Sequence, residues 1–191
     1  MADLRLFIAV PVPGAIKAAL AEAQQILTHS NPHVRSTGVT GIHLTLKFLG
    51  ATPEQRIAEL RRAMEGAVRT VQKPIRLSCA GVGAFPNPKS PRVLWAGLQG
   101  DTAELTRLQQ GLDLHLVQLG IPRDERPFHA HLTLGRIKEP KMLGSLRKAM
   151  EKLAQKDFGE FTAEALVLYS SDLRPTGAVY TSIERIKLPG S

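Results

Sequence analysis

The tetrapeptide His-Leu-Thr-Leu occurs twice, at His43–Leu46 in the stretch HLTLKFLG and at His131–Leu134 in the stretch HLTLGR, 88 residues apart. Apolar and polar residues alternate through both stretches, which is typical of a strand with one buried face. Residues i and i+2 of a strand share a face, so each histidine projects beside its threonine while the leucines project into the core. Each copy therefore predicts a strand that presents an imidazole and a hydroxyl together.

The predicted elements around the two motifs also recur in the same order. The first half predicts strand, helix, strand, helix and strand at residues 4–10, 14–27, 42–49, 53–68 and 75–82. The second half repeats this order at residues 92–98, 102–119, 130–137, 143–154 and 161–169, and adds a strand at 178–188 after a turn at 175–177. Such a recurrence is the signature of an internal repeat.

We therefore predict an α+β fold in which residues 1–191 form a single bilobal domain with repeat halves at about 4–82 and 92–188. Each lobe is expected to be a small sheet with outer helices, and a pseudo-twofold axis would bring the two HLTL strands face to face across a central cleft. Between the main elements, 29–41 and 121–128 are predicted loops, and Thr52 is a predicted N-cap for the helix after it.

Composition narrows the class of protein. Hydrophobic residues make up 43% of the 191, enough for a packed core, which excludes a disordered chain. No apolar run is long enough to span a membrane and no secretory signal is visible, so we expect a cytoplasmic protein. The lone Cys79 rules out an internal disulfide and a multi-thiolate metal site. The net charge of +8 suits a polyanionic partner such as RNA, and it equally suits simple solubility.

The paired strands carry the candidate chemistry. Histidine both takes and gives a proton near neutral pH, so opposed imidazoles of His43 and His131 could serve as base and acid in one displacement at phosphorus. The hydroxyls of Thr45 and Thr133 could donate hydrogen bonds to phosphate oxygens without a metal. One His-x-Thr strand alone would be compatible with a structural pair, but its recurrence at equivalent positions favours catalysis. His129 forms a His-x-His pair with His131, yet no third metal ligand lies nearby in the sequence.

The sequence resembles the two-histidine (2H) phosphoesterase superfamily over essentially its whole length. The similarity is closest to its LigT-like branch, the RNA 2′,3′-cyclic phosphodiesterases also known as 2′-5′ RNA ligases. Besides the HLTL motifs, it includes RLFIAVPVP at 5–13, PRVLW at 91–95 and LYSSDL at 168–173. Two departures are Ala130, where the family often has proline, and the absence of a tryptophan from 34–41.

This resemblance implies a metal-independent enzyme, without cofactors, that hydrolyses terminal 2′,3′-cyclic phosphates of RNA to 2′-phosphates. His43 would be the proton donor, His131 the proton acceptor, and Thr45 and Thr133 would hold the phosphoryl oxygens. An RNA 5′-hydroxyl in place of water would give an ATP-independent 2′-5′ ligase. Expected partners are RNA ends, tRNA fragments among them, and the expected state is a monomer. Two alternatives stay open: another 2H activity on small cyclic nucleotides or 2′-5′ linkages, and an RNA-binding module that does not catalyse.

Phe48 and Arg136 are also 88 residues apart, and the resemblance implies that they sandwich the terminal base. Simple alternation places both on the face opposite their histidines, where a core phenylalanine and a surface arginine would need no further role. A bend near Gly50 and Gly135 would reconcile the two interpretations.

Overall fold

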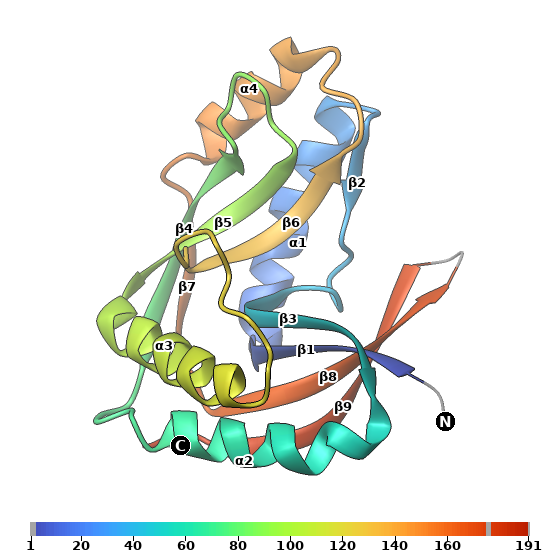
Figure 1. Ribbon diagram of the computed structural model, residues 1–191. Coiled ribbons are helices and arrows are strands. Elements are labelled where there is room, and N and C mark those ends of the chain that lie inside the picture. The colour runs from blue at the N-terminus through green and yellow to red at the C-terminus, as the bar shows by residue number, and fades with distance from the viewer. Residues whose placement is uncertain (1–2, 175–176, 191) are drawn as a thin grey trace.

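The computed structural model describes residues 3–174 and 177–190, so Pro175 and Thr176 of the predicted turn lie outside the described residues. Within these ranges the chain forms two antiparallel sheets and four α-helices (Figure 1). The four-stranded sheet has the order β3 (His43–Pro53), β1 (Asp3–Pro11), β8 (Ala165–Arg174) and β9 (Gly177–Lys187). The five-stranded sheet has the order β2 (Val34–Ser36), β6 (His131–Ile137), β5 (Val93–Gly100), β4 (Arg76–Phe85) and β7 (Asp157–Thr162).

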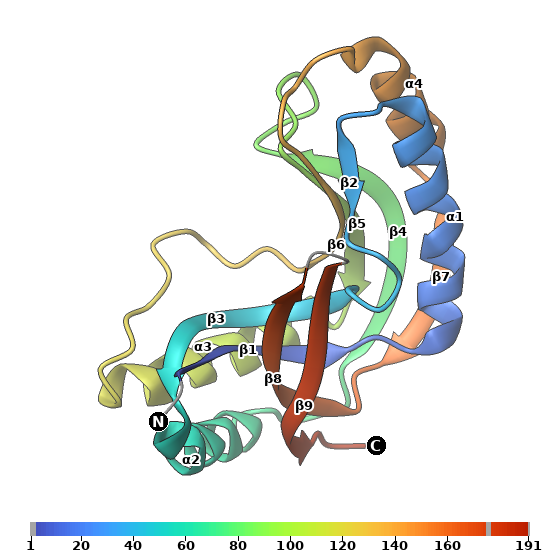
Figure 2. The same cartoon turned by 90° about the vertical axis from the view of Figure 1, so that its right-hand side faces the viewer.

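Two helices cover each sheet. Helices α1 (Gly14–Ser30) and α4 (Leu143–Leu153) pack together on the outer face of the five-stranded sheet, as Figure 2 shows. Helix α2 (Ile57–Val68) packs against β8 and β9 and against α3 (Thr102–Gln118). The apolar stripes that predicted these helices are buried, including Leu20 of α1 and Leu108 of α3, because each stripe closes over a sheet. The predicted α+β bilobal fold is confirmed.

The two sequence halves exchange elements between the sheets. Helix α1 belongs to the first half yet covers the sheet built around β5 and β6. Strand β4 likewise joins that sheet, whereas β8 of the second half joins β1. Helix α3 begins and ends 88 residues after α1, the same offset that separates the HLTL motifs. Each sheet therefore combines strands from both halves of the sequence.

Three local predictions are wrong. The predicted strand at 161–169 is two strands, because the chain crosses between the sheets at Ala163, whose buried N–H donates to the Ile75 carbonyl at 2.9 Å. The predicted loop at 29–41 contains β2. Thr52 does not cap a helix: it pairs with Leu4 inside β3, and its hydroxyl donates to the Gly50 carbonyl at 3.2 Å. A short 3₁₀ helix at Glu54–Arg56 then precedes α2.

Candidate active site

A β-bulge in each HLTL strand determines which side chains share the histidine face. On β1, Phe7 pairs with Phe48 and Ala9 pairs with Thr45, and the register shift between Ile8 and Ala9 leaves Leu46 of β3 unpaired. One extra residue in a strand reverses the alternation beyond it. Phe48 therefore lies on the same face as Thr45 and His43.

The second strand has its bulge at the equivalent residue. On β5, Leu94 pairs with Gly135 and Trp95 pairs with Thr133, which leaves Leu134 unpaired. Arg136 pairs with Val93, two residues from Trp95, so its side chain shares the face of Thr133 and of His131.

The alternation that placed Phe48 and Arg136 opposite their histidines is thus wrong. The reconciling feature is a bulge at Leu46 and at Leu134, each before the predicted bend at Gly50 or Gly135. Both residues are exposed, and Phe48 is 66% exposed. The interpretation of Phe48 as a core residue is therefore excluded by its exposure.

His43, the first residue of the edge strand β3, lies in an aromatic cluster with side chains of β1, β8 and β9. Its ring centroid is 5.7 Å from Phe7, 4.8 Å from Tyr169 and 5.0 Å from Tyr180. Its Nδ1 is 3.2 Å from the carbonyl of Gly41. Burial, followed by the charge of Lys17, lowers the pKa of His43 to about 4, against the opposing effect of the Gly41 bond. The imidazole is therefore neutral at pH 7 in the free protein.

His131 is held in a matching way on the other sheet. Its ring packs edge-on against Phe85 with a centroid distance of 5.1 Å, and its Nδ1 is 2.7 Å from the carbonyl of His129. Burial lowers the pKa of His131, and the charges of His129 and Arg136 lower it further, while the bond to the His129 carbonyl raises it.

Both imidazoles offer the same ring nitrogen for chemistry. In each, Nδ1 faces the carbonyl of the residue two positions earlier. A carbonyl only accepts, so Nδ1 carries the proton in the neutral ring and Nε2 presents its lone pair. Strands β3 and β6 contact each other although they belong to different sheets. The two strands that carry these imidazoles therefore meet at the junction of the sheets.

Buried polar side chains secure both bulged strands. The Nε2 of Gln24, a buried residue of α1, donates to the Leu134 carbonyl at 2.8 Å and to the Thr37 hydroxyl at 3.0 Å. The Thr37 N–H donates to the same carbonyl at 3.1 Å. Next to the other bulge, the buried Nζ of Lys47 lies 3.1 Å from Asp113 of α3. Sequence patterns missed Gln24, Thr37 and Lys47 as site supports, since their partners lie far along the chain.

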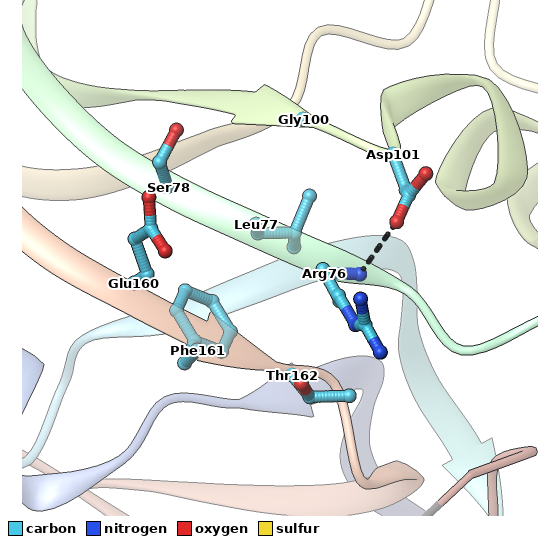
Figure 3. A pocket seen from close by; sticks show the side chains of 8 residues that line it. All are labelled: Arg76, Leu77, Ser78, Gly100, Asp101, Glu160, Phe161 and Thr162. Carbon is cyan, nitrogen blue, oxygen red and sulfur yellow. Dashed lines mark hydrogen bonds between the residues drawn. The ribbon is translucent and has the colours of Figure 1, made fainter.

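The hollow drawn in Figure 3 lies elsewhere, where β4 and β7 run beside the start of α3. It has a volume of about 380 Å³ and includes neither HLTL motif. Asp101 accepts a hydrogen bond from the backbone N–H of Arg76 at 3.0 Å, as the dashed line shows, and also one from the Lys73 ammonium. These bonds tie the loop before β4 to the start of α3, which is a structural role.

The family model of the 2′-5′ RNA ligase superfamily matches residues 12–175. The chain belongs to this superfamily. A relative from Archaeoglobus fulgidus, an RNA 2′,3′-cyclic phosphodiesterase by name, is 35% identical over 182 residues, which cover 94% of this chain and 98% of the relative. The structure of TT0787 from Thermus thermophilus matches with a TM-score of 0.78 and 33% identity, covering 97% of this chain and 98% of that one.

E. coli LigT complexed with 3′-AMP matches with a TM-score of 0.76 and 25% identity, covering 97% of this chain and 98% of that one. The resemblance to LigT-like 2H phosphoesterases is thus confirmed. In this member of the superfamily, Cys79 is fully buried, and burial raises its pKa to about 12.

The surroundings of His129, the grouping of metal-ligating side chains and the character of the helices bear on metal binding and on membrane insertion. His129 is exposed and lies 6.1 Å from the Phe85 ring by centroids. Across residues 3–174 and 177–190, no three His, Cys, Asp or Glu side chains gather in a group that could hold a metal ion. No helix in the same ranges has the length and apolar character needed to cross a membrane.

The low pKa of His43 can be measured by following its ring proton by NMR between pH 3 and pH 9. We expect a midpoint of about 4, and we expect Lys17→Met to raise it, because the ammonium charge disfavours the imidazolium. The pKa of an unfolded histidine is ~6.5. Between that pH and about 4, the unfolded chain therefore binds more protons than the folded protein does. The free energy of unfolding should decrease as pH falls through this window. Lys152→Met, on the exposed face of α4, is the control and should leave the midpoint unchanged. An unchanged midpoint in Lys17→Met would exclude an effect of the Lys17 charge on the pKa of His43.

Proposed function

We propose that this protein is an RNA 2′,3′-cyclic phosphodiesterase that hydrolyses terminal 2′,3′-cyclic phosphates to 2′-phosphates, with ATP-independent 2′-5′ RNA ligase capability. The single observation that carries this proposal is the pairing of the two motifs. β3 and β6 come from different sheets, contact each other, and present two neutral imidazoles with the same free nitrogen. A displacement at phosphorus needs one base and one acid on opposite sides of the reacting atom.

In the proposed reaction, His131 Nε2 takes a proton from water while the water oxygen forms a bond to phosphorus. The bond from phosphorus to the 3′ oxygen breaks, and protonated His43 gives its Nε2 proton to that oxygen. The products are a 2′-phosphate and a 3′-hydroxyl, with the proton now on His131. Exchange with solvent returns one proton to His43 and removes one from His131, which resets the enzyme.

The negative charge of the bound phosphate would favour the protonated form of His43, which is the acid. In the free protein the pKa of His43 is about 4, so few molecules carry its proton at pH 7. An anion beside an imidazole raises its pKa, so binding of the cyclic phosphate favours proton uptake. An RNA 5′-hydroxyl in place of water would form a 2′-5′ linkage, with no nucleotide triphosphate, because the strained cyclic ester provides the driving force.

Four further side chains complete the proposal. Thr45 and Thr133, both half-buried beside their histidines, would donate hydrogen bonds to the non-bridging oxygens. Phe48 and Arg136 would sandwich the terminal base, since both lie exposed on the histidine face, and such stacking contributes about 1–3 kcal/mol per base. We also propose that the enzyme acts as a cytoplasmic monomer on RNA ends such as those of tRNA fragments.

The test is hydrolysis of a 2′,3′-cyclic mononucleotide and of an oligonucleotide with a cyclic phosphate end, both in EDTA, with products identified by chromatography. We expect both to give 2′-phosphates. Turnover of the mononucleotide alone would favour a small-nucleotide phosphoesterase, and binding without turnover would favour a non-catalytic RNA-binding module. A 3′-phosphate product would contradict the assigned leaving oxygen.

A further inference from the structure

We propose that Arg35 and the edge of the Arg136 guanidinium form a second anion site, which binds the phosphate 5′ of the terminal nucleoside and makes the enzyme prefer oligonucleotides to mononucleotides. The face of the Arg136 guanidinium stays available to stack on the terminal base, because a planar guanidinium stacks with its face and donates hydrogen bonds from its edge. This inference rests on the proposed phosphodiesterase function, because it takes the terminal nucleotide to lie at His43 and His131. The ligand chemistry is a phosphodiester of single-stranded RNA.

The strand register places both arginines beside the active site. On the edge strand β2, Arg35 pairs directly with Arg136 of β6, between the pairs Val34 with Ile137 and Ser36 with Gly135. Directly paired residues of antiparallel strands share a face. Since the bulge at Leu134 turns Arg136 to the face of His131, Arg35 lies on that face as well.

Burial agrees with this assignment. Val34 and its partner Ile137 are buried in the core, whereas both arginines are exposed. The positive charge of Arg136 is near enough to the His131 ring to lower the pKa of His131. The pair therefore continues the row of polar groups from His131 and Thr133 one strand further, toward the sheet edge.

The two guanidinium groups are close in register and lack anionic partners. In the described part of the chain, neither Arg35 nor Arg136 forms an ion pair with a carboxylate. Like charges directly opposite on neighbouring strands destabilise a sheet. A bound phosphodiester would relieve this repulsion, and guanidinium groups match phosphate oxygens with two parallel hydrogen bonds.

β2 is fixed in place although it is short and pairs with one strand alone among the described elements. The Thr37 hydroxyl donates to the Thr133 carbonyl at 3.1 Å, directly after β2. Gln24, which is 5% exposed, bonds to both Thr37 and the Leu134 carbonyl. The arginine pair is therefore presented by an ordered strand, which limits the entropy lost when an anion binds.

Three substrates separate the contributions of the phosphate and of a second nucleoside. Adenosine 2′,3′-cyclic phosphate carries no 5′ phosphate, the same compound with a 5′-phosphate carries the anion alone, and the dinucleotide ApA with a cyclic phosphate end carries the complete phosphodiester. We would measure kcat/KM for each, and in parallel the Kd of each by calorimetry on the His43→Asn variant, with and without the arginine change.

We expect Arg35→Gln to lower the ratio of dinucleotide to mononucleotide kcat/KM about tenfold, with Arg35→Lys in between. One lost phosphate contact should also reduce the salt dependence of dinucleotide binding by about 0.7 in log–log slope. The control Arg62→Gln removes an exposed arginine of α2, away from β2, and should leave the ratio unchanged.

The outcomes for the anion site and for the phosphodiesterase are distinct. If the protein turns over its substrates, but Arg35→Gln changes neither the ratio of dinucleotide to mononucleotide kcat/KM nor the Kd values, the anion site is overturned. The phosphodiesterase proposal then still holds. A dinucleotide Kd that depends on Arg35, without turnover of any substrate by the unmodified protein, would support the anion site and overturn the phosphodiesterase. A gain from the 5′-phosphate alone equal to that from the dinucleotide would identify the phosphate as the recognised group.

Discussion

Replacement of His43 by alanine is expected to lower kcat for hydrolysis of a 2′,3′-cyclic phosphate by about 10²–10⁴-fold, because one positioned proton transfer contributes that much. His131→Ala should cause a loss of the same order, since its Nε2 holds the equivalent position on the other sheet. The two groups act in one displacement, so the double variant should lose far less than the product of the single losses. Single-turnover kinetics at pH 7 would measure all three.

These losses can be assigned to catalysis only if the variants remain folded. His43 is 9% exposed and packs against Phe7, Tyr169 and Tyr180, so alanine leaves a space in that cluster. His43→Asn fills more of it without a titrating group near neutral pH, and circular dichroism with urea unfolding would verify that both variants fold. Near-normal turnover by either variant would exclude His43 from the chemistry.

The acid and base roles can be separated with a substrate whose leaving group needs no proton, such as a p-nitrophenyl phosphodiester. Loss of the general acid should then matter much less, while loss of the general base should matter as before. We expect His43→Ala to recover most of its deficit on this substrate and His131→Ala to recover little. The reverse pattern would exchange the two roles.

Most of the helices and strands, and the strand positions of the two histidines, could be predicted from the sequence because their signals are local. The stripe of Ile16, Leu20, Ala23 and Leu27 has helical spacing and is buried as a unit in α1. The HLTL alternation likewise indicated a strand with histidine and threonine on one face. Patterns of this kind depend on neighbours within a few residues, so they can be recognised without the rest of the chain.

Pairing between distant segments could not be predicted in the same way. The alternation of apolar Phe161, Ala163 and Ala165 with polar residues continues without a break in the sequence, although the chain changes sheets there. The bulged residues Leu46 and Leu134 are leucines like Leu44 and Leu132 two positions earlier, so nothing local marks them as extra residues in the ladder. The face of Phe48 and Arg136 depends on those bulges, which is why simple alternation failed there.

Lys47 follows the first bulge directly, and its replacement should have the largest effect on stability. The side chain is 2% exposed, and its Nζ lies 3.1 Å from Asp113, 3.3 Å from Asp124 and 2.8 Å from the Pro122 carbonyl. Lys47→Met removes the charge but leaves Asp113 buried without its cation. Removing one partner of a buried pair costs about 3–5 kcal/mol, so urea unfolding at pH 7 should show a loss of that order.

Two comparisons test whether burial is the cause. Adding Asp113→Leu to Lys47→Met removes both charges and should restore much of the lost stability, because an apolar pair of similar volume often replaces a buried ion pair without loss. Lys73→Met breaks an ion pair with Asp101 in which the lysine side chain is 59% exposed, and such pairs contribute about 0–1 kcal/mol. A loss in Lys47→Met as small as that in Lys73→Met would mean that this buried ammonium contributes no more than a surface charge. A large loss that Asp113→Leu does not relieve would instead assign the effect to the bonds that Lys47 makes with the segment at 122–124, which leads to β6 and His131.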